Sequence, residues 1–290
     1  MKVSGFTIIK NAVINGYPIV EAITSILPVV DEMIVLIGDC DDDTRGLIEA
    51  IGDPKIKIHH SVWDKNLRKG GTVLAVETDK AFKLIDPAST WAFYIQADEV
   101  IHEKYYTAIR KGCEDFKDNT KVQGLLFKYL HFYGTYDYVG DSRKWYGHEV
   151  RIIRNDKKIS SYKDAQGFRV GKEKLHVKPI DASVYHYGWV KNPEQMMTKS
   201  KNLGLLWRTD EEAKALLEQP DYFDYNEFDS LAKFTGTHPD VMQKRIAEMS
   251  WKVELDISKK KLAGKKRVLY YFEKLTGIRL FDFKNYRIIR

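Results

Sequence analysis

Acidic side chains follow two of the apolar segments in the first hundred residues, and carboxylates placed in this way can hold a metal ion. Residues 33–37 run into a turn that contains four aspartates between positions 39 and 43, and residues 91–95 run into Gln96-Ala97-Asp98-Glu99. Oxygen ligands suit Mg²⁺ and Mn²⁺, and either ion can bridge from a carboxylate to a diphosphate. Asp98 and Glu99 are the stronger candidates, because adjacent carboxylates after a strongly apolar segment are costly to bury unless they are paired or bound to metal.

The acids between positions 39 and 43 also have a structural interpretation. They precede a predicted helix, where Asp42 or Asp43 can cap the helix and the helix dipole favours negative charge. A calcium loop of the EF-hand type is excluded, because its sixth position requires Gly and is Thr44, and its twelfth requires Glu and is Ala50. For these acids, capping and ligand binding both stay open.

Several motifs of common enzyme classes are missing from the sequence. There is no G-x-G-x-x-G after the first predicted strand, no Walker A loop, no H-E-x-x-H and no G-x-S-x-G. These absences disfavour dehydrogenases, P-loop NTPases, zincins and α/β-hydrolases. The two cysteines, Cys40 and Cys113, are too few for a disulfide framework or a structural zinc site, which fits a reducing compartment.

The elements that must position these acids follow the pattern of βα units. We predict strands over residues 3–9, 32–37, 55–60 and 91–95, and helices over residues 17–27, 43–51 and 72–85. This alternation is typical of an α/β fold with a mostly parallel sheet flanked by helices. Both acid runs follow predicted strands, and ligands in such sheets bind at the carboxyl ends of the strands.

The remaining two thirds of the chain differ from this pattern. Between residues 123 and 187 the apolar period shortens toward two and aromatic residues are frequent, which predicts an antiparallel, β-rich insertion. Beyond Pro193 the helical period returns, with predicted helices over residues 194–206, 209–218, 239–253 and 265–275. We therefore expect one domain over residues 1–192 and a helical C-terminal appendage over residues 193–290.

Length and composition fit a globular protein. The chain has 290 residues, of which 43% are hydrophobic and 30% charged, and this balance disfavours disordered and low-complexity classes. No apolar run approaches the roughly 18 residues needed to span a bilayer, and no signal-peptide core precedes the first predicted strand. We expect a cytoplasmic protein.

The order of three motifs resembles that of family two glycosyltransferases with the GT-A fold. The motifs are Phe6-Thr7-Ile8-Ile9-Lys10-Asn11, the acidic turn with Asp42-Asp43-Thr44, and Tyr94-Ile95-Gln96-Ala97-Asp98-Glu99. The resemblance covers about residues 1 to 190 and implies a GT-A-type, Rossmann-like catalytic domain. It also implies that a nucleotide is held by residues at these strand ends, namely Thr7, Ile9, Lys10, Asn11, Asp39, Asp41, Asp42, Gln96 and Ala97.

The same resemblance implies Mn²⁺ or Mg²⁺ on the diphosphate of a sugar nucleotide. Asp98 matches the second acid of the family's Asp-x-Asp motif and Glu99 the residue after it, whereas Gln96 stands where the first acid is common. His186, in Tyr185-His186-Tyr187-Gly188-Trp189, resembles a histidine that adds a metal or diphosphate contact in several GT-A enzymes. A histidine between aromatic residues is also a common core residue, so both interpretations of His186 stay open.

An inverting sugar transfer also needs a base, because the acceptor hydroxyl attacks the anomeric carbon while the nucleoside diphosphate leaves from the opposite face. Two carboxylates are candidates. Asp164 lies in a polar, loop-like segment before the His186 strand, where relatives place this base. Glu149 opens a predicted strand, but with Arg151 it can equally form a structural ion pair. We favour Asp164 over Glu149.

The positive charge of the chain is concentrated at its C-terminal end. The net charge is +6, but residues 258–290 contain 11 Lys and Arg against 2 acids, a net charge of +9, so residues 1–257 carry −3. Apolar residues such as Leu269, Phe272 and Phe283 are interleaved with these charges. A basic amphipathic helix can bind an anionic membrane surface. Its apolar residues can equally dock the segment onto the rest of the chain.

These observations predict a metal-dependent, inverting glycosyltransferase that takes a nucleotide-sugar donor, with a UDP-sugar favoured, and a glycan, lipid-linked or small acceptor. Such a reaction belongs to cell-surface glycan biosynthesis, and the basic C-terminus would then place the protein at the inner face of the membrane. Nucleic acid is not an expected partner, because the basic residues lie on predicted helices away from the sheet. The alternatives are a nucleotidyltransferase acting on a sugar phosphate, and a non-enzymatic protein that binds nucleic acid or a membrane surface.

Overall fold

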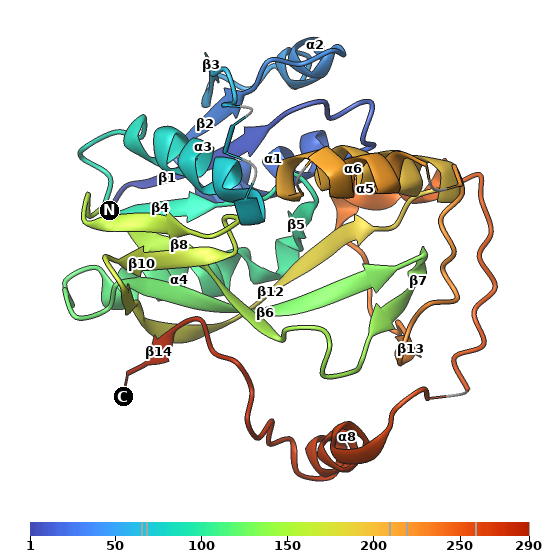
Figure 1. Ribbon diagram of the computed structural model, residues 1–290. Coiled ribbons are helices and arrows are strands. Elements are labelled where there is room, and N and C mark those ends of the chain that lie inside the picture. The colour runs from blue at the N-terminus through green and yellow to red at the C-terminus, as the bar shows by residue number, and fades with distance from the viewer. Residues whose placement is uncertain (65, 68, 209, 219, 259, 290) are drawn as a thin grey trace.

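The central sheet combines a parallel half and an antiparallel half in the order β13-β7-β6-β8-β4-β1-β2-β3 (Figure 1). The computed structural model describes residues 1–64, 66–67, 69–208, 210–218, 220–258 and 260–289. In the parallel half, β1 pairs with both β2 and β4, and β2 pairs with β3. The four strands are β1 (Val3–Ile9), β2 (Glu32–Ile37), β3 (Ile56–His60) and β4 (Trp91–Tyr94), as the sequence predicted to within a residue at each end.

The antiparallel half is built by three strands of the β-rich insertion and one short strand from the C-terminal region. It consists of β8 (His148–Arg154), β6 (Gly124–Tyr133), β7 (Thr135–Gly140) and β13 (Leu231–Lys233). A separate antiparallel sheet contains β9 (Ile159–Tyr162), β10 (Gly167–Val170) and β11 (Glu173–Lys174).

One strand of the insertion departs from the antiparallel prediction. The long strand β12 (His176–Trp189) runs parallel to β6, because the chain passes through β7 to β11 between them and this supplies the crossover that parallel pairing requires. It also pairs with β5 (Glu99–Ile101) and β14 (Arg287–Ile288).

Helices cover both faces of the parallel half, and β1, β2 and β4 are buried along their whole length. In β1, Val3 and Ile9 belong to one core cluster, and Phe6 and Ile8 to the other, since successive side chains point to opposite faces. Helix α1 (Ile19–Ile26), with the 3₁₀ turn η1 (Leu27–Val29), packs on the first face together with α4 (Tyr106–Phe116). Helix α3 (Thr72–Lys83) packs on the second.

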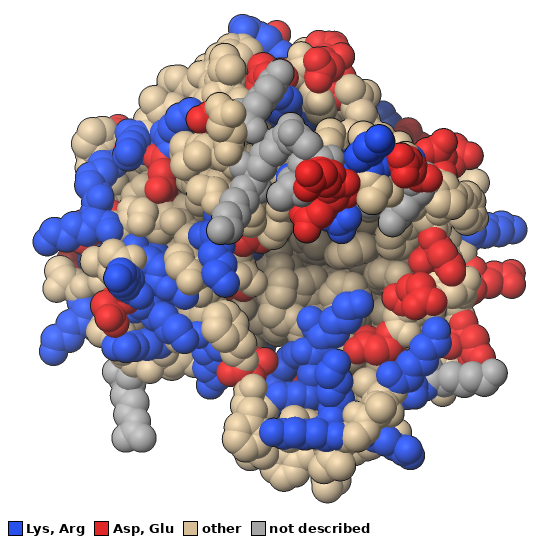
Figure 2. All heavy atoms as spheres, in the orientation of Figure 1, with Lys and Arg blue, Asp and Glu red and all other residues tan. Residues whose placement is uncertain are grey.

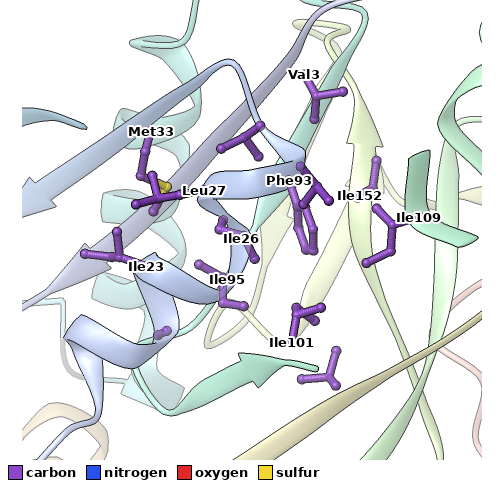
Figure 3. Packing of buried hydrophobic residues seen from close by; sticks show 14 of the residues in the cluster. Val3, Ile23, Ile26, Leu27, Met33, Phe93, Ile95, Ile101, Ile109 and Ile152 are labelled. Atoms are coloured by element: carbon purple, nitrogen blue, oxygen red, sulfur yellow. The ribbon is translucent and has the colours of Figure 1, made fainter. Parts of the chain in front are cut away.

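Figure 3 shows the first cluster from close by. Ile23 and Ile26 of α1 lie against Phe93 of β4 and the following Ile95, and Ile109 of α4 approaches from the other side. All five side chains are almost completely buried. This packing fixes the carboxyl ends of β1 and β4 relative to each other, and the first and third of the predicted motifs lie at these two ends. The predicted fold class, an α/β sheet with flanking helices and a β-rich insertion, is confirmed.

The C-terminal region contributes helices and also two strands of the same sheet. Its helices are α5 (Pro193–Trp207), α6 (Asp210–Leu217), α7 (Gln243–Ala247) preceded by η4 (Asp240–Met242), and α8 (Gly264–Thr276). Helix α5 begins where the sequence places the boundary, because the Asn192 side chain accepts a hydrogen bond from the Gln195 amide at 2.7 Å. Thr209, in the second predicted helix, lies outside the described residues. No helix in the described part of the chain is long and apolar enough to cross a bilayer.

The predicted helix over residues 239–253 is wrong in its second half. The helix ends at Ala247. The indole of Trp251 donates a hydrogen bond to the Gly134 carbonyl at 3.0 Å, and Leu255 is buried in a cluster with Tyr133 and Tyr225. These contacts hold residues 251–255 against the end of β6, so tertiary packing overrides the helical period.

Candidate functional site

A cleft of about 1010 Å³ opens at the carboxyl ends of β1 and β4, and α5 supplies one of its walls. Most of the residues singled out in the sequence line it: Ile9, Lys10, Asn11, Asp41, Gln96, Ala97, Asp98, Asp164 and His186. The other five lie outside the lining: Thr7, Asp39, Asp42, Glu99 and Glu149. The sequence therefore predicted the position of the cleft, and the structure separates the residues that face it from those that support it.

Asp98 lies among basic groups in this cleft. Its Oδ2 is 2.9 Å from the Lys199 ammonium and 3.7 Å from His186 Nε2. Lys199 also donates to the Gly188 carbonyl at 2.8 Å. The three side chains come from the end of β4, from β12 and from α5, so only the folded chain brings them together.

The electrostatics of the group follow from burial and from these neighbours. Burial alone would raise the pKa of Asp98, but Lys199 and His186 hold that pKa well below its usual range, so the carboxylate is ionised. Burial lowers the pKa of His186, and Asp98 only partly offsets this effect, so the imidazole is neutral at neutral pH. Its Nδ1 has no hydrogen-bond partner among the described residues. An ionised carboxylate thus faces a neutral imidazole, which is the protonation state that metal binding requires.

The pair fits a divalent ion that takes its remaining ligands elsewhere. No three His, Cys, Asp or Glu side chains of the described residues form a metal-binding group by themselves. However, a Cβ placed on Gly188 would lie 2.6 Å from Asp98 Oδ2 and 2.7 Å from His186 Nε2, so the glycine keeps the space beside both atoms free. Mg²⁺ is commonly held by one or two protein ligands together with substrate phosphates and water. Asp98 and His186 fit that pattern.

Glu99 does not face the cleft, contrary to its prediction as a metal ligand. It is completely buried, and both of its oxygens accept hydrogen bonds from Arg151, at 2.8 Å from Nε and 2.5 Å from the terminal nitrogen. The Tyr129 hydroxyl donates to the same carboxylate. The costly burial of two adjacent acids is thus resolved in two ways, since Glu99 is paired with an arginine and Asp98 with a lysine.

The segment after β1 meets the acidic turn after β2. Lys10 Nζ is 2.8 Å from Asp39 Oδ1, and Asn11 and Asp41 exchange hydrogen bonds of 3.1 and 2.8 Å. Burial opposes ionisation of Asp39, but the hydrogen bonds from Lys10 and from the Trp63 amide hold its pKa below the ordinary value. Asp39 therefore orients Lys10 at the edge of the cleft, while Asn11 and Asp41 line it.

The next two aspartates have structural partners. Asp42 accepts hydrogen bonds from the Ile14 amide at 2.8 Å and from the Thr44 amide at 3.0 Å, which ties the two loops together. Asp43 caps α2 (Thr44–Glu49) and accepts from the Gly46 amide at 3.0 Å. The capping alternative is thus realised at Asp43, and Asp42 braces the loop after β1.

The two candidate bases occupy different environments. Asp164 lines the cleft in a turn between β9 and β10, where the neighbouring Lys163 and Ala165 both have positive φ angles. Burial raises the pKa of Asp164, and backbone hydrogen bonds offset this only in part. Glu149 is 3% exposed and lies outside the cleft lining on β8, and its Oε2 has no hydrogen-bond partner among the described residues. Burial raises the pKa of Glu149 to about 8, although Arg151 acts in the opposite direction.

Sequence reasoning missed two buried lysines near Asp98, of which Lys199 lines the cleft. Lys199 is nearly buried, and Lys191 is fully buried with its ammonium 2.5 Å from the Gly16 carbonyl. Both ammonium groups lie over the ring of Tyr17, at 4.9 and 5.3 Å from its centre. Burial lowers the pKa of Lys191 strongly, with a further contribution from Lys199. One signal was available: Lys199 shares a helical face with Met196 and Leu203, where an apolar residue is expected.

Comparison with known proteins places the chain by fold only. No model of a protein family matches the chain, and no curated protein sequence does. Among solved structures, TarS of S. aureus is similar with a TM-score of 0.39 and 14% identity over 75% of this chain and 42% of the other. Glucosyl-3-phosphoglycerate synthase from Mycobacterium tuberculosis, in complex with Mn²⁺, UDP and phosphoglyceric acid, is similar with a TM-score of 0.31. Its sequence identity is 18%, over 45% of this chain and 43% of the other. The chain spans less than half the length of these two proteins.

A third similar structure is 4-diphosphocytidyl-2C-methyl-D-erythritol synthase from Anaerococcus prevotii, with a TM-score of 0.38 and 13% identity over 75% of this chain and 96% of that one. The sheet order β3-β2-β1-β4, with antiparallel β8 beyond it, is an observation of the structure, whereas the mostly parallel sheet and the acidic motif directly after β4 were predicted from the sequence. These similarities, all with TM-scores below 0.4, are in the fold alone.

Proposed function

We propose that this chain is a glycosyltransferase that moves a sugar from a nucleotide-sugar donor to an acceptor hydroxyl, with inversion at the anomeric carbon. The observation that carries the proposal is the grouping of Asp98, His186 and Lys199 in one cleft with a second carboxylate, Asp164. Asp98, His186 and Lys199 together are suited to binding a diphosphate, and Asp164 is suited to accepting a proton. A reaction that expels a nucleoside diphosphate and deprotonates a hydroxyl needs both.

The diphosphate of the donor would lie beside Asp98 and Lys199. Mn²⁺ or Mg²⁺, held by Asp98 and His186, would neutralise charge on the departing diphosphate when bound. Lys199 adds a fixed positive charge at the same place, and its contact with Asp98 orients it toward the cleft. In a water-poor cleft such charges stabilise a leaving group more strongly than they would in bulk water.

The nucleoside would lie at the end of β1, where Lys10, Asn11 and Asp41 line the cleft together with Gln96 and Ala97. These residues offer donors and acceptors for a base and a ribose, and Trp63 supplies an aromatic surface beside them. A UDP-sugar is the donor that we propose to test first.

Asp164 would accept the proton of the acceptor hydroxyl. Its raised pKa makes it a better proton acceptor near neutral pH than an ordinary aspartate, because a base works best when its pKa approaches the working pH. Glu149 is a poorer candidate, since its carboxyl lies outside the cleft lining.

Trp189 and Trp207 also line the cleft, and their rings would suit the apolar face of a glycan or lipid-linked sugar.

The experiment is calorimetric titration with UDP-, GDP-, CMP- and dTDP-sugars, with and without Mn²⁺, followed by detection of the released product. Asp98→Asn should lose the Mn²⁺-dependent part of nucleotide binding. Asp164→Asn should retain donor affinity but lose transfer by about 10² to 10⁴-fold. Asp181→Asn, an exposed carboxylate on the same strand as His186, serves as the control and should change neither.

Three outcomes would contradict the proposal. Absence of binding for every nucleotide sugar, with and without Mn²⁺, would exclude this donor class. Release of pyrophosphate from a nucleoside triphosphate and a sugar phosphate, without release of a nucleoside diphosphate from any nucleotide sugar, would instead identify a nucleotidyltransferase. A fully active Asp164→Asn variant beside an inactive Glu149→Gln variant with normal nucleotide affinity would transfer the role of base to Glu149.

A further inference from the structure

Helix α8 turns its apolar side away from the rest of the protein. Val268, Tyr271, Phe272 and Leu275 are spaced i, i+3, i+4 and i+7, which places them on one helical face. Their exposed fractions are 69%, 52%, 37% and 87%. A helix that docks on a domain normally buries such a stripe, so α8 has the reverse of the usual orientation.

The polar side of α8 makes the contacts with the body. The Tyr270 hydroxyl donates to Asp141 at 2.8 Å, and Glu273 forms an ion pair of 2.7 Å with Arg143. Arg279, just beyond the helix, donates to the Trp145 carbonyl at 2.6 Å. The orientation is thus held by specific polar bonds, and the alternative that the apolar residues dock the segment onto the domain is not what the structure shows.

The chain after α8 continues the apolar surface and then anchors itself. Ile278, Leu280, Phe281 and Phe283 are all exposed, Phe281 to 81%. Tyr286 is buried in the core cluster that α3 covers, and β14 pairs with β12. The segment is thus held against the body at both ends. We call the two groups of exposed apolar side chains together the C-terminal apolar surface (Val268, Tyr271, Phe272, Leu275, Ile278, Leu280, Phe281 and Phe283).

The charges around this surface are almost entirely positive. The two acids of the segment, Glu273 and Asp282, are both paired with arginines, Asp282 with Arg279 at 3.0 Å. Lys265, Lys266 and Arg267 are exposed at the start of α8. In Figure 2, Lys and Arg side chains gather over the lower part of the molecule around α8, beneath the hollow in the middle of this face.

We propose that the C-terminal apolar surface docks the protein onto an anionic lipid bilayer. Exposed aromatic and aliphatic side chains beside Lys and Arg match a surface that is negatively charged outside and apolar a few ångströms deeper. A second copy of the chain would bring two basic surfaces together, which like-charge repulsion opposes. The proposal does not depend on the reaction in the cleft.

The test is flotation of the full chain with vesicles of phosphatidylcholine alone and of phosphatidylcholine mixed with phosphatidylglycerol, at low and high salt. We expect binding to the anionic vesicles only, weakened by salt. Phe272→Ser combined with Leu275→Ser should lower the affinity by about tenfold or more, because two apolar side chains no longer enter the lipid. Val62→Ser, an equally exposed apolar position after β3, is the matched control and should bind as the unchanged protein does.

A second variant separates charge from apolar burial. Replacing Lys265, Lys266 and Arg267 by Gln should weaken binding at low salt and reduce its salt dependence. The proposal is overturned if the folded, intact protein does not bind anionic vesicles, or if it binds neutral and anionic vesicles equally. A dimer in sedimentation velocity that is lost in the Phe272→Ser, Leu275→Ser variant, without any vesicle binding, would assign the surface to a second copy.

Discussion

Replacing Glu149 by Gln should make the chain more stable relative to the unchanged protein at alkaline pH than it does at pH 6. Glu149 is 3% exposed, and burial raises its pKa from the ordinary 4.5 to about 8. The folded chain therefore holds a proton on this carboxyl between those two values, whereas the unfolded chain has released it. Stability is then fully present below about pH 4.5 and falls as the pH rises toward 8.

The size of the effect follows from the pKa difference. Each pH unit over which one state holds the extra proton changes the free energy of unfolding by about 1.4 kcal/mol. From pH 4.5 to 8 the loss is at most about 5 kcal/mol, and the part between pH 6 and pH 8 is about 3 kcal/mol. A glutamine side chain does not titrate, so the Glu149→Gln variant escapes this loss.

The assay is urea unfolding of both proteins at pH 6 and pH 9. The free energy of unfolding of Glu149→Gln, minus that of the unchanged protein, should rise by about 3 kcal/mol between the two pH values. Glu32→Gln is the matched control, because Glu32 is equally buried but its pKa is held below the ordinary value: burial opposes ionisation, and the bonds from Lys57 and Ser4 outweigh it. The Glu32→Gln substitution should change the free energy of unfolding by the same amount at both pH values. The argument is refuted if the free energy of unfolding of Glu149→Gln, minus that of the unchanged protein, is also the same at pH 6 and pH 9.

The remaining predictions concern the partners of the two adjacent acids. Arg151→Met should destabilise the fold by about 3–5 kcal/mol in urea unfolding, because it leaves the buried Glu99 charge unpaired. Gly188→Ala should keep the fold but weaken Mn²⁺-dependent nucleotide binding about tenfold in calorimetry, because its Cβ would lie 2.6 Å from Asp98 Oδ2. Lys199→Met should destabilise the chain most at neutral pH. The difference should shrink as the pH falls below about 4, because the unfolded chain then takes up a proton on Asp98, and the stability that comes from its depressed pKa is complete only above the ordinary value.

Each of these predictions has a contrary result. A fully stable Arg151→Met variant would mean that water reaches Glu99. Unchanged Mn²⁺-dependent affinity in Gly188→Ala would place the metal away from Asp98. A stability loss in Lys199→Met that does not vary with pH would mean that Lys199 acts through packing rather than through its charge.

Local periodicity was sufficient for the parallel half of the fold. A strand buried on both faces can be an unbroken apolar run, such as residues 33–37 of β2, and amphipathic helices separate the strands. The placement of acids at the carboxyl end of β4 then follows from general rules of βα topology. The sequence therefore predicted the edge of the sheet at which the cleft lies and nine of the residues that line it.

The segments where the sequence misled are those shaped by distant partners. The period of residues 248–253 is helical, yet Trp251 bonds to Gly134 in a turn more than a hundred positions earlier. The direction of β12 relative to β6 likewise depends on the course of the whole insertion. Periodicity reports which side chains are apolar but not which element they will meet.

The roles of Asp98 and Glu99 were decided by tertiary structure alone. In sequence they are neighbours of the same chemistry, and either suits a metal. In the fold, β5 turns Glu99 inward to Arg151 while Asp98 stays in the cleft beside Lys199, about a hundred residues away along the chain. A charge can be buried only where an opposite charge meets it, and the meeting place of two side chains from remote segments is a property of the folded chain.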